Sequence, residues 1–515
     1  MSESGLGSPA AVSTSSRLSL FLDRVGLQGF PWVSAIVLYT ISWGWLFIVR
    51  DSYWSDDWDY FKFRGITDFD YRTLGFAPWS RINLIIFDTF GPEFLRLLIF
   101  IIFFSSAVLL YGIIKDSELL DSSQRKFLVL LFLILPFNSA RLSLNTFVYS
   151  IAYLYFFLAW FVLVRFGTFK SKFLSLVLFF LSFQMFTNLV FFLLPVANMY
   201  FLEGRGSLRV FLNWTRRYLL FLLAPLIYWA LRTVFWSGSG NYHDITSNKI
   251  NGFFRFLLIV AVTFFFLILG FIWSKEVVRR RITLVIISWG AIVVGYLPYV
   301  FFGLVGYGFK VPMTYLVTML GRSDWFSRHQ IIQPLGFSLF LISLVDLLPS
   351  FSNKFRRLFL SMILVISVVF NIAFGFEYVV DFKKQTLVVA ALGAEPNKTA
   401  GNEVQMVDQT TLLNARGRSY RERDWLGLVG LAEGVDSAKK LKVVAGCSES
   451  PNVRLVLIQG PETHWQALKN WVRERDMGFK VTVDDTPGAC KPEMVTPERV
   501  SGVIPILFYF TGAKN

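Results

Sequence analysis

Long apolar stretches, each near the length of one membrane crossing, alternate with short polar stretches over the first 380 residues of the chain. A helix needs about 20 mostly apolar residues to cross the hydrocarbon core of a bilayer. The pattern therefore predicts an all-α polytopic membrane domain over 31–380. The stretches that we expect to be spans are 31–49, 94–114, 126–138, 146–165, 172–202, 218–236, 252–273, 282–303, 332–349 and 358–378.

Lysine and arginine gather in short segments between these stretches. These segments are 115–126, 165–172, 203–217, 274–281 and 352–357. Because basic residues in short loops stay on the cytoplasmic side, they orient the spans. Only 172–202 breaks the alternation, since both of its ends are basic, and as one helix it would be about 46 Å long. We expect it to turn back near 184–188, which gives about eleven crossings, with the N-terminus cytoplasmic and the C-terminus outside.

The two ends of the chain differ from this apolar region. Residues 1–30 are serine-rich and lack the basic start of a signal peptide. We therefore expect a cytoplasmic tail with a short amphipathic helix, followed by an uncleaved first span. Residues 395–515 predict a small C-terminal α/β domain on the outer, extracytoplasmic side. Its strand-like runs are 441–446, 453–460, 479–485 and 503–510, and its helix-like run is 464–475.

Composition agrees with a membrane protein. Hydrophobic residues make up 54% of the chain and charged residues only 17%, against about 25% charged in an ordinary soluble domain. The net charge of +15 comes largely from the basic loops, and no basic stripe with interleaved stacking aromatics predicts a nucleic-acid partner. There are three histidines in all, and no Cys/His spacing predicts a zinc site.

The two cysteines of the chain, Cys447 and Cys490, both fall in the expected outer C-terminal domain. An oxidising compartment lets a disulfide persist, and we expect these two thiols to form one structural bond.

The most unusual polar stretch is RDSYWSDDWDYFKFRG, at 50–65, which carries four aspartates within nine residues. It directly follows the first span and opens the expected outer loop 50–93. Trp54, Trp58 and Phe61 recur at i, i+4 and i+7, which predicts a helix lying in the membrane interface.

Two aspartates of this stretch are candidates for catalysis. On such a helix Asp56 falls off the aromatic face and Asp57 lies at its edge. A carboxylate beside an apolar wall has a raised proton affinity and suits a general base acting on a polar acceptor. A solvated acidic loop with ordinary interfacial aromatics also explains the same residues.

Cations also collect on the expected outer side, against the usual charge rule. They are Arg81, Arg141, Lys310, Arg322, Arg328 and His329. Each alone could be an anchor whose charge reaches the interface, and a lone histidine often merely packs there. Together they suit a phosphate at headgroup level, because arginine binds phosphate bidentately.

Two short motifs resemble a known family. The acidic pair in SDDW (Asp56 and Asp57) lies in the first outer loop, and Ser327-Arg328-His329 with Pro334 lies before a late span. Both are similar to elements of the GT-C superfamily of membrane glycosyltransferases, especially bacterial O-antigen-modifying (Gtr-type) enzymes, over about 30–380. Many relatives have Asp-Glu where this chain has Asp-Asp, which leaves open which aspartate is the base.

The resemblance implies a polyprenyl-phosphate-linked sugar as donor and a glycan or lipid as acceptor, at the periplasmic face of a bacterial inner membrane. An aspartate of the first outer loop would deprotonate the acceptor, which attacks the anomeric carbon with inversion. The outer cations would hold the leaving phosphate. No cofactor is implied, and dependence on a divalent metal is left open.

Two other classes of protein remain. A transporter or flippase of lipid-linked sugars would place ionisable residues near the midplane on broken helices, often with internal repeats, whereas here the charges lie in loops and no repeat is evident. A membrane-anchored binding protein would not need so many spans. The chain also lacks GxxxxGK[ST] and GxSxG motifs, so neither a P-loop nor a nucleophile elbow is expected.

Overall fold

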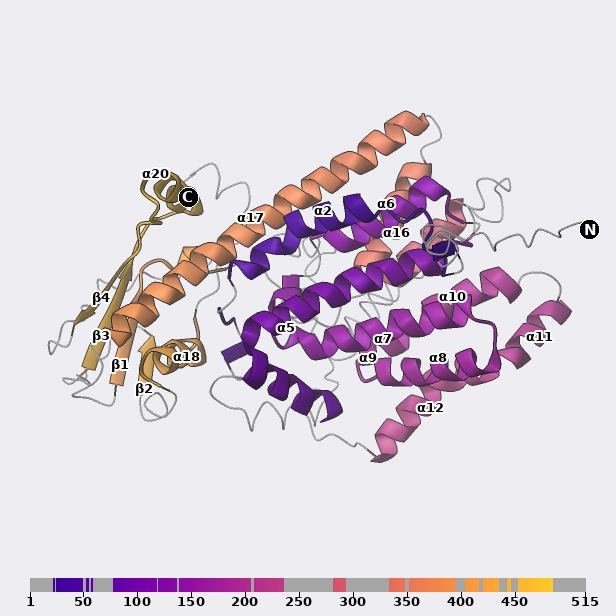
Figure 1. Cartoon of the computed structure of the whole chain (residues 1–515), viewed down its shortest axis with the longest axis horizontal. Helices are drawn as coiled ribbons and strands as arrows, with labels where there is room; N and C mark the ends of the chain where they lie inside the picture. Colours follow the sequence, from indigo (N-terminus) through magenta and orange to yellow (C-terminus); the bar gives the residue numbers. More distant parts are fainter. Residues whose placement is uncertain are drawn as a thin grey trace, which may run out of the picture.

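A computed structural model gives the fold of the chain. It describes residues 22–23, 25–49, 52–54, 57–58, 77–117, 119–136, 139–204, 208–235, 281–292, 333–347, 352–394, 403–415, 420–434, 442–445 and 453–484. These residues are mostly helical, and a small sheet lies at one end of the molecule (Figure 1).

The helices before the sheet pack side by side into a bundle (Figure 1). They are α2 (Trp32–Trp43), η1 (Gly44–Phe47), α5 (Ala77–Ile114), α6 (Ser122–Ile134), η2 (Ser139–Leu142), α7 (Thr146–Arg165), α8 (Phe169–Ser182), α9 (Phe186–Phe191), α10 (Leu193–Met199), η3 (Tyr200–Gly204), α11 (Leu208–Arg217), α12 (Leu219–Phe235), Arg281–Ile292, α16 (Gln333–Leu347) and α17 (Asn353–Gly393).

Within the described residues, three helices are long and apolar enough to cross a membrane, and a fourth span results if α11 and α12, bent by 49°, are counted as one. The three are Arg81–Ile114, Thr146–Arg165 and Asn353–Gly393. Trp32–Phe47, Arg281–Ile292 and Pro334–Leu347 are shorter apolar helices. The expectation of about eleven crossings extends into residues outside the described ranges.

Helix α5 begins earlier than the sequence predicts. It includes 77–90, which we expected in the outer loop, and it bends at Gly91, whose φ is 79°, directly before Pro92. Proline lacks the backbone N–H that an uninterrupted helix needs, and glycine adopts a positive φ without strain. The bend leaves Ile85 and Phe90 largely exposed on the first part of the helix.

The long apolar stretch 172–202 is interrupted where the sequence predicts a turn. Helix α8 ends at Ser182 and α9 begins at Phe186. In Figure 1 the chain runs along α8 and then returns through α9 and α10 toward the end where α8 begins. The buried Asn188 side chain donates to the carbonyl oxygen of Ser182 (2.9 Å), which closes the turn.

Helix α17 connects the bundle to the sheet as one continuous helix of 41 residues (Figure 1). Its first half carries an exposed apolar stripe that includes Leu358, Val365 and Val369, as expected of a surface that faces lipid. Its second half passes the expected end of the span at 378. There Val380 and Val388 are buried against the C-terminal domain.

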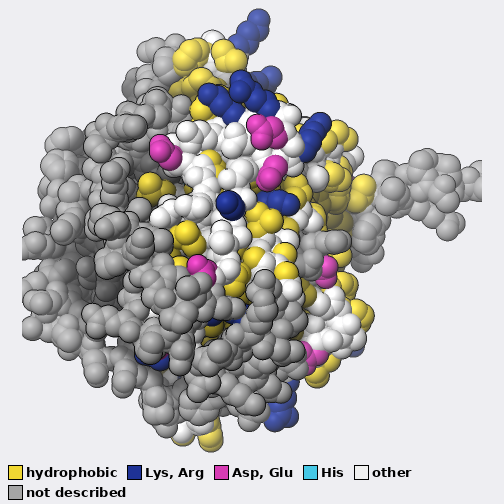
Figure 2. All heavy atoms as spheres, turned by 90° about the vertical axis from the view of Figure 1, so that its left-hand side faces the viewer, with side chains coloured by type: hydrophobic (Ala, Val, Ile, Leu, Met, Phe, Trp, Pro, Cys, Tyr) yellow, Lys and Arg dark blue, Asp and Glu magenta, His cyan; other side chains and the backbone are white. Residues whose placement is uncertain are grey.

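The C-terminal domain is a four-stranded sheet with the order β2-β1-β3-β4. Its elements are β1 (Glu403–Asp408), η7 (Thr411–Leu413), α18 (Glu422–Glu433), β2 (Lys442–Ala445), β3 (Val453–Gln459), α20 (His464–Glu474) and β4 (Lys480–Asp484). Strand β1 pairs in parallel with β2 and β3, and β4 is antiparallel to β3. Figure 2 views this end of the molecule, where basic and acidic side chains lie among apolar ones.

The sequence predicted β2, β3, β4 and α20, and the structure confirms these four elements. It did not predict β1 or α18, although β1 is central in the sheet. The run 503–510, together with Cys447 and Cys490, lies outside the described residues.

Candidate functional site

The carboxylate of Asp57 lies inside the protein, next to the turn before α7. Its Oδ1 accepts hydrogen bonds from Ser143 Oγ (2.5 Å) and from the backbone N–H of Leu144 (2.9 Å). A longer bond comes from the N–H of Asn145 (3.4 Å), and Oδ2 accepts from the N–H of Trp54 (3.4 Å). Asp57 therefore joins the acidic stretch to a segment more than eighty residues further along the chain.

This position suits a negative charge. The N–H groups near a helix N-terminus lack partners within the helix and carry a partial positive charge. The N-cap residue of α7, Asn145, makes no side-chain capping bond. The carboxylate of Asp57 is close to this N-terminus and binds the backbone just before it.

Burial nevertheless makes the charge costly. It raises the pKa of Asp57 to about 6, although the positive charge of Arg96 and the hydrogen bonds from Ser143, Asn145 and Trp54 act in the opposite direction. The pKa shift has the direction that the sequence predicts for a carboxylate beside an apolar wall.

Arg96 of α5 joins the backbone just before Asp57 to the turn that binds Asp57. Its guanidinium donates to the carbonyl oxygens of Val49 (3.1 Å), Ser52 (2.5 Å) and Leu142 (3.5 Å), and it lies 5.1 Å from the Trp54 ring centroid. Arg96 is fully buried. Arg96 was not among the predicted site residues, although an ionisable side chain within an apolar span is a signal of an interior role.

The prediction that Trp54 and Trp58 lie in the membrane interface is wrong. Both indoles are buried, with exposed fractions of 0% and 1%. Trp54 packs edge-on against Tyr378 of α17, at 5.3 Å between ring centroids, and Trp58 packs against Gly427 of α18. The reason is that the second half of α17 and the C-terminal domain cover this stretch, which the local pattern of the stretch could not reveal.

Several predicted site residues cannot be compared with the structure. Asp56, Lys310, Arg322, Arg328 and His329 lie outside the described residues.

The structure does describe two of the predicted phosphate-binding cations. Arg81 is exposed on the first part of α5. Arg141 is buried, with its guanidinium 4.1 Å and 4.5 Å from the ring centroids of Trp43 and Phe103, and it donates to the carbonyl oxygen of Leu133 (3.2 Å). Arg81 and Arg141 thus differ in exposure, and phosphate binding by either stays a prediction.

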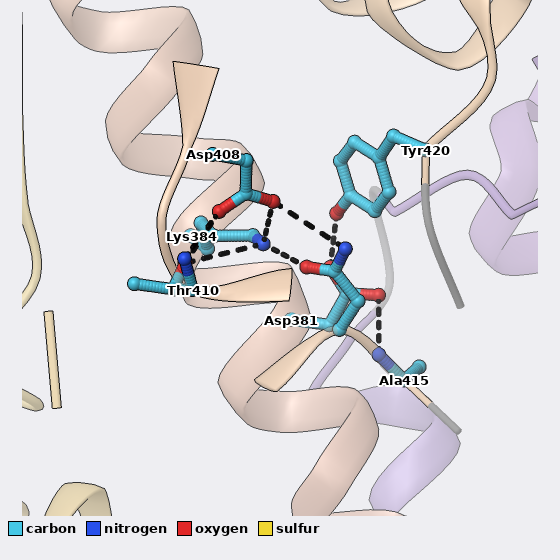
Figure 3. Close-up of polar contacts among 7 residues, drawn as sticks. Asp381, Lys384, Asp408, Thr410, Ala415 and Tyr420 are labelled. Atoms are coloured by element: carbon cyan, nitrogen blue, oxygen red, sulfur yellow. Dashed lines mark hydrogen bonds and ion pairs between the residues drawn. The ribbon is translucent and has the colours of Figure 1, made fainter. Parts of the chain in front are cut away.

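A second polar cluster joins α17 to the C-terminal domain (Figure 3). The ammonium group of Lys384 lies 2.8 Å from Asp408 Oδ2 and also donates to the side-chain oxygen of Asn414. Asp381 accepts hydrogen bonds from the Tyr420 hydroxyl and from the N–H of Ala415 (3.0 Å).

Electrostatics in this cluster favour the ion pair. Burial raises the pKa of Asp408, but the charge of Lys384 and hydrogen bonds from Lys384 and Thr410 outweigh it, so the pKa is lowered. The carboxylate lies at the carboxyl end of β1, where parallel α/β sheets often bind ligands. In this protein the side chains of Lys384, Thr410 and Asn414 occupy that position. The cluster therefore forms a contact between α17 and the C-terminal domain.

His464, at the start of α20, is buried beside the cluster. Burial lowers its pKa to about 4; a hydrogen bond with the backbone of Leu413 raises it and the charge of Lys384 lowers it further. The imidazole is therefore neutral near pH 7 and contributes no charge to the contact.

Among the described residues, no group of three or more His, Cys, Asp or Glu side chains is arranged to hold a metal ion. Comparisons with protein-family models, with curated proteins and with solved structures find no match to this chain. Its function is therefore inferred from its own residues.

Proposed function

We propose that this protein is a membrane glycosyltransferase of the GT-C type. It would transfer a sugar from a polyprenyl-phosphate donor to a glycan or lipid acceptor at the periplasmic face of a bacterial inner membrane. The observation that carries the proposal is the anchoring of Asp57, whose buried carboxylate binds Ser143 and Leu144. This anchor holds the backbone at Asp57 beside the helical bundle, which a freely solvated acidic loop would not need.

The two aspartates then have different roles. The carboxylate of Asp57 is occupied by donors of the protein itself, so it positions the stretch. Asp56 would be the general base and would accept the proton of the acceptor hydroxyl. The acceptor oxygen forms a bond to the anomeric carbon while the bond from that carbon to the phosphate oxygen breaks, with inversion.

The leaving polyprenyl phosphate keeps the bonding electron pair, and its charge requires cations. Arg328 is the leading candidate because its planar guanidinium can bind two phosphate oxygens. The further candidates for the same role are Lys310, Arg322, His329, Arg81 and Arg141. All of the groups needed for the reaction are side chains, so the proposal includes no cofactor.

The test reconstitutes the full chain in liposomes with a panel of polyprenyl-phosphate hexoses and pentoses and measures release of free polyprenyl phosphate. Asp56→Asn keeps the shape of the side chain but removes its basicity, so turnover should fall by about 10²–10⁴-fold with normal folding. Asp57→Asn would place an amide N–H₂ against Ser143 and Leu144, so it should instead lower the yield of folded protein.

Two results would contradict the proposal. Near-normal turnover of Asp56→Asn would show that it is not the base. Movement of intact donor between leaflets, without release of polyprenyl phosphate, would identify a transporter of lipid-linked sugars.

A further inference from the structure

The ring of Trp58 fits directly onto the backbone of α18 in the C-terminal domain. A Cβ atom added at Gly427 would overlap the six-membered ring of Trp58, so this contact needs glycine at position 427. Trp58 is 1% exposed. The residue that follows Asp57 is therefore enclosed by a domain from the opposite end of the chain.

Helix α17 makes a second contact with the same stretch. The side chain of Gln385 donates to the carbonyl oxygen of Tyr53 (3.2 Å), and both residues are buried. The Tyr53 ring packs against the Trp58 ring, at 5.1 Å between centroids. The packing of these two rings thus links the contact between Gln385 and Tyr53 to the contact between Trp58 and Gly427.

Three of the contacts that hold the described residues of this stretch come from different elements. The turn before α7 binds Asp57, α17 binds Tyr53, and α18 binds Trp58. Two of these three contacts come from the C-terminal part of the chain. Local backbone bonds, such as that from the N–H of Asp57 to the carbonyl oxygen of Trp54 (3.0 Å), would not set the position of the stretch relative to the bundle.

We propose that the C-terminal domain positions the acidic stretch for catalysis, with Trp58 and Gln385 as positioning residues. This inference rests on the proposed function. Trp58 and Gln385 are given no part in the chemistry; they hold the described residues on either side of Asp56 in the sequence. A shift of about 1 Å in a catalytic group can cost about 10²-fold in rate, so loosening the stretch should lower kcat.

The experiment uses Gly427→Ala in the full chain, because the added methyl group displaces Trp58. The matched control is Gly393→Ala at the end of α17, where an added Cβ would be 3.8 Å from the carbonyl oxygen of Ala432, an ordinary contact. Both are measured for kcat and for KM of the donor. We expect Gly427→Ala to lower kcat by about 10²-fold with little change in KM, and Gly393→Ala to match the wild type.

A second readout does not depend on activity. Ser52 is fully buried and close in size to cysteine, so Ser52→Cys should react slowly with a maleimide, measured against the parent protein without this change. Combined with Gly427→Ala, its labelling rate should rise several-fold. Gln385→Ala, which removes only the bond to Tyr53, should give a smaller rise and serves if Gly427→Ala fails to fold.

Replacing Trp58 by a smaller residue tests the mechanism. Trp58→Leu should itself lower kcat, but adding Gly427→Ala to it should cost little more, because the overlap with the ring is gone. If the losses in kcat caused by Trp58→Leu and Gly427→Ala were fully additive, Gly427→Ala would not act by displacing the Trp58 ring.

The outcomes separate this inference from the proposed function. Unchanged labelling in Gly427→Ala and Gln385→Ala would overturn the positioning by the C-terminal domain, whether or not the protein transfers sugar. Faster labelling with unchanged kcat would overturn it too. Faster labelling in a protein whose wild type releases no polyprenyl phosphate would instead refute the proposed function and, with it, the catalytic role given to the positioning.

Discussion

Asp57 is buried, and the hydrogen bonds and the positive charge around it offset only part of the free-energy cost of burying its carboxylate charge. Its carboxylate binds Ser143 and Leu144 and is close to Arg96, yet its pKa is raised to about 6 from an ordinary value of 3.8. Between these two pH values the folded protein holds this proton more firmly than the unfolded chain does. Stability linked to Asp57 is therefore fully present below about pH 3.8 and is lost as the pH rises through about 6.

This linkage gives a prediction for Asp57→Asn in detergent. Asparagine does not titrate, so the free energy of unfolding of the wild type should fall relative to that of the variant as the pH rises from 4 to 7, by about 2 kcal/mol. The measurement is the difference between the two unfolding free energies at each pH. Parallel curves over this range would show that Asp57 has an ordinary pKa in the folded protein.

At the residue scale the sequence singled out Asp56 and Asp57 as candidates but did not reveal the partners of Asp57. Asp56 and Asp57 are neighbours in the chain, and Ser143, which binds the carboxylate of Asp57, lies 86 positions further along. Arg141, a predicted phosphate ligand, is buried between the rings of Trp43 and Phe103, a contact that the sequence did not predict. Contacts between distant segments decide such details, and no local pattern encodes them.

At the scale of elements, α17 shows what periodicity can and cannot reveal. Hydropathy predicted its membrane-crossing part but ended the span at 378, where polar residues such as Asp381 and Lys384 begin. The helix continues because these residues have partners in the C-terminal domain. Strand β1 was missed for a similar reason: Glu403 and Gln405 interrupt its apolar pattern, yet Gln405 is 2% exposed in the centre of the sheet.

The contact between Lys384 and Asp408 gives a prediction for this junction. Both side chains are buried, and removing one partner of a buried ion pair typically costs about 3–5 kcal/mol because the other charge is left unpaired. Lys384→Met should therefore speed hydrogen exchange in β1 and proteolysis of the C-terminal domain. Replacing both partners, as Lys384→Met with Asp408→Leu, should cost less than the sum of the two single changes.

Lys383→Met is the matched control for this experiment. Lys383 is the adjacent residue on α17 and is exposed, so its loss should leave exchange and proteolysis unchanged. Equal effects of Lys383→Met and Lys384→Met would mean that the ion pair does not hold the domain.

At the scale of the whole molecule, the bundle and the C-terminal domain meet along α17 and at the acidic stretch. The sequence placed the loop between α7 and α8 on the cytoplasmic side and the C-terminal domain outside. In Figure 1 the loop joining α7 to α8 lies toward the end of the molecule away from the sheet, and the side of the membrane on which each lies stays a prediction.

Labelling of single cysteines in intact cells tests this topology. Gly167→Cys lies between α7 and α8, where an added Cβ meets nothing within 4 Å. It should react with an impermeant maleimide only after the membrane is permeabilised. Glu474→Cys, exposed at the end of α20, should react in intact cells. The reverse labelling pattern would show that the protein has the opposite orientation in the membrane.

The hydrogen bond between Gln385 and Tyr53 joins residues 332 positions apart, and this separation has a consequence during synthesis of the chain. Chains are synthesised from the N-terminus at about 5–20 residues per second, so roughly 20–70 s pass between the two residues. During that interval the stretch lacks its contacts with α17 and α18, whereas the partners Arg96 and Ser143 have already been made. A chain that stops before the C-terminal domain is made would therefore reach the membrane with Asp57 present but without the contacts of Tyr53 and Trp58 to that part of the chain.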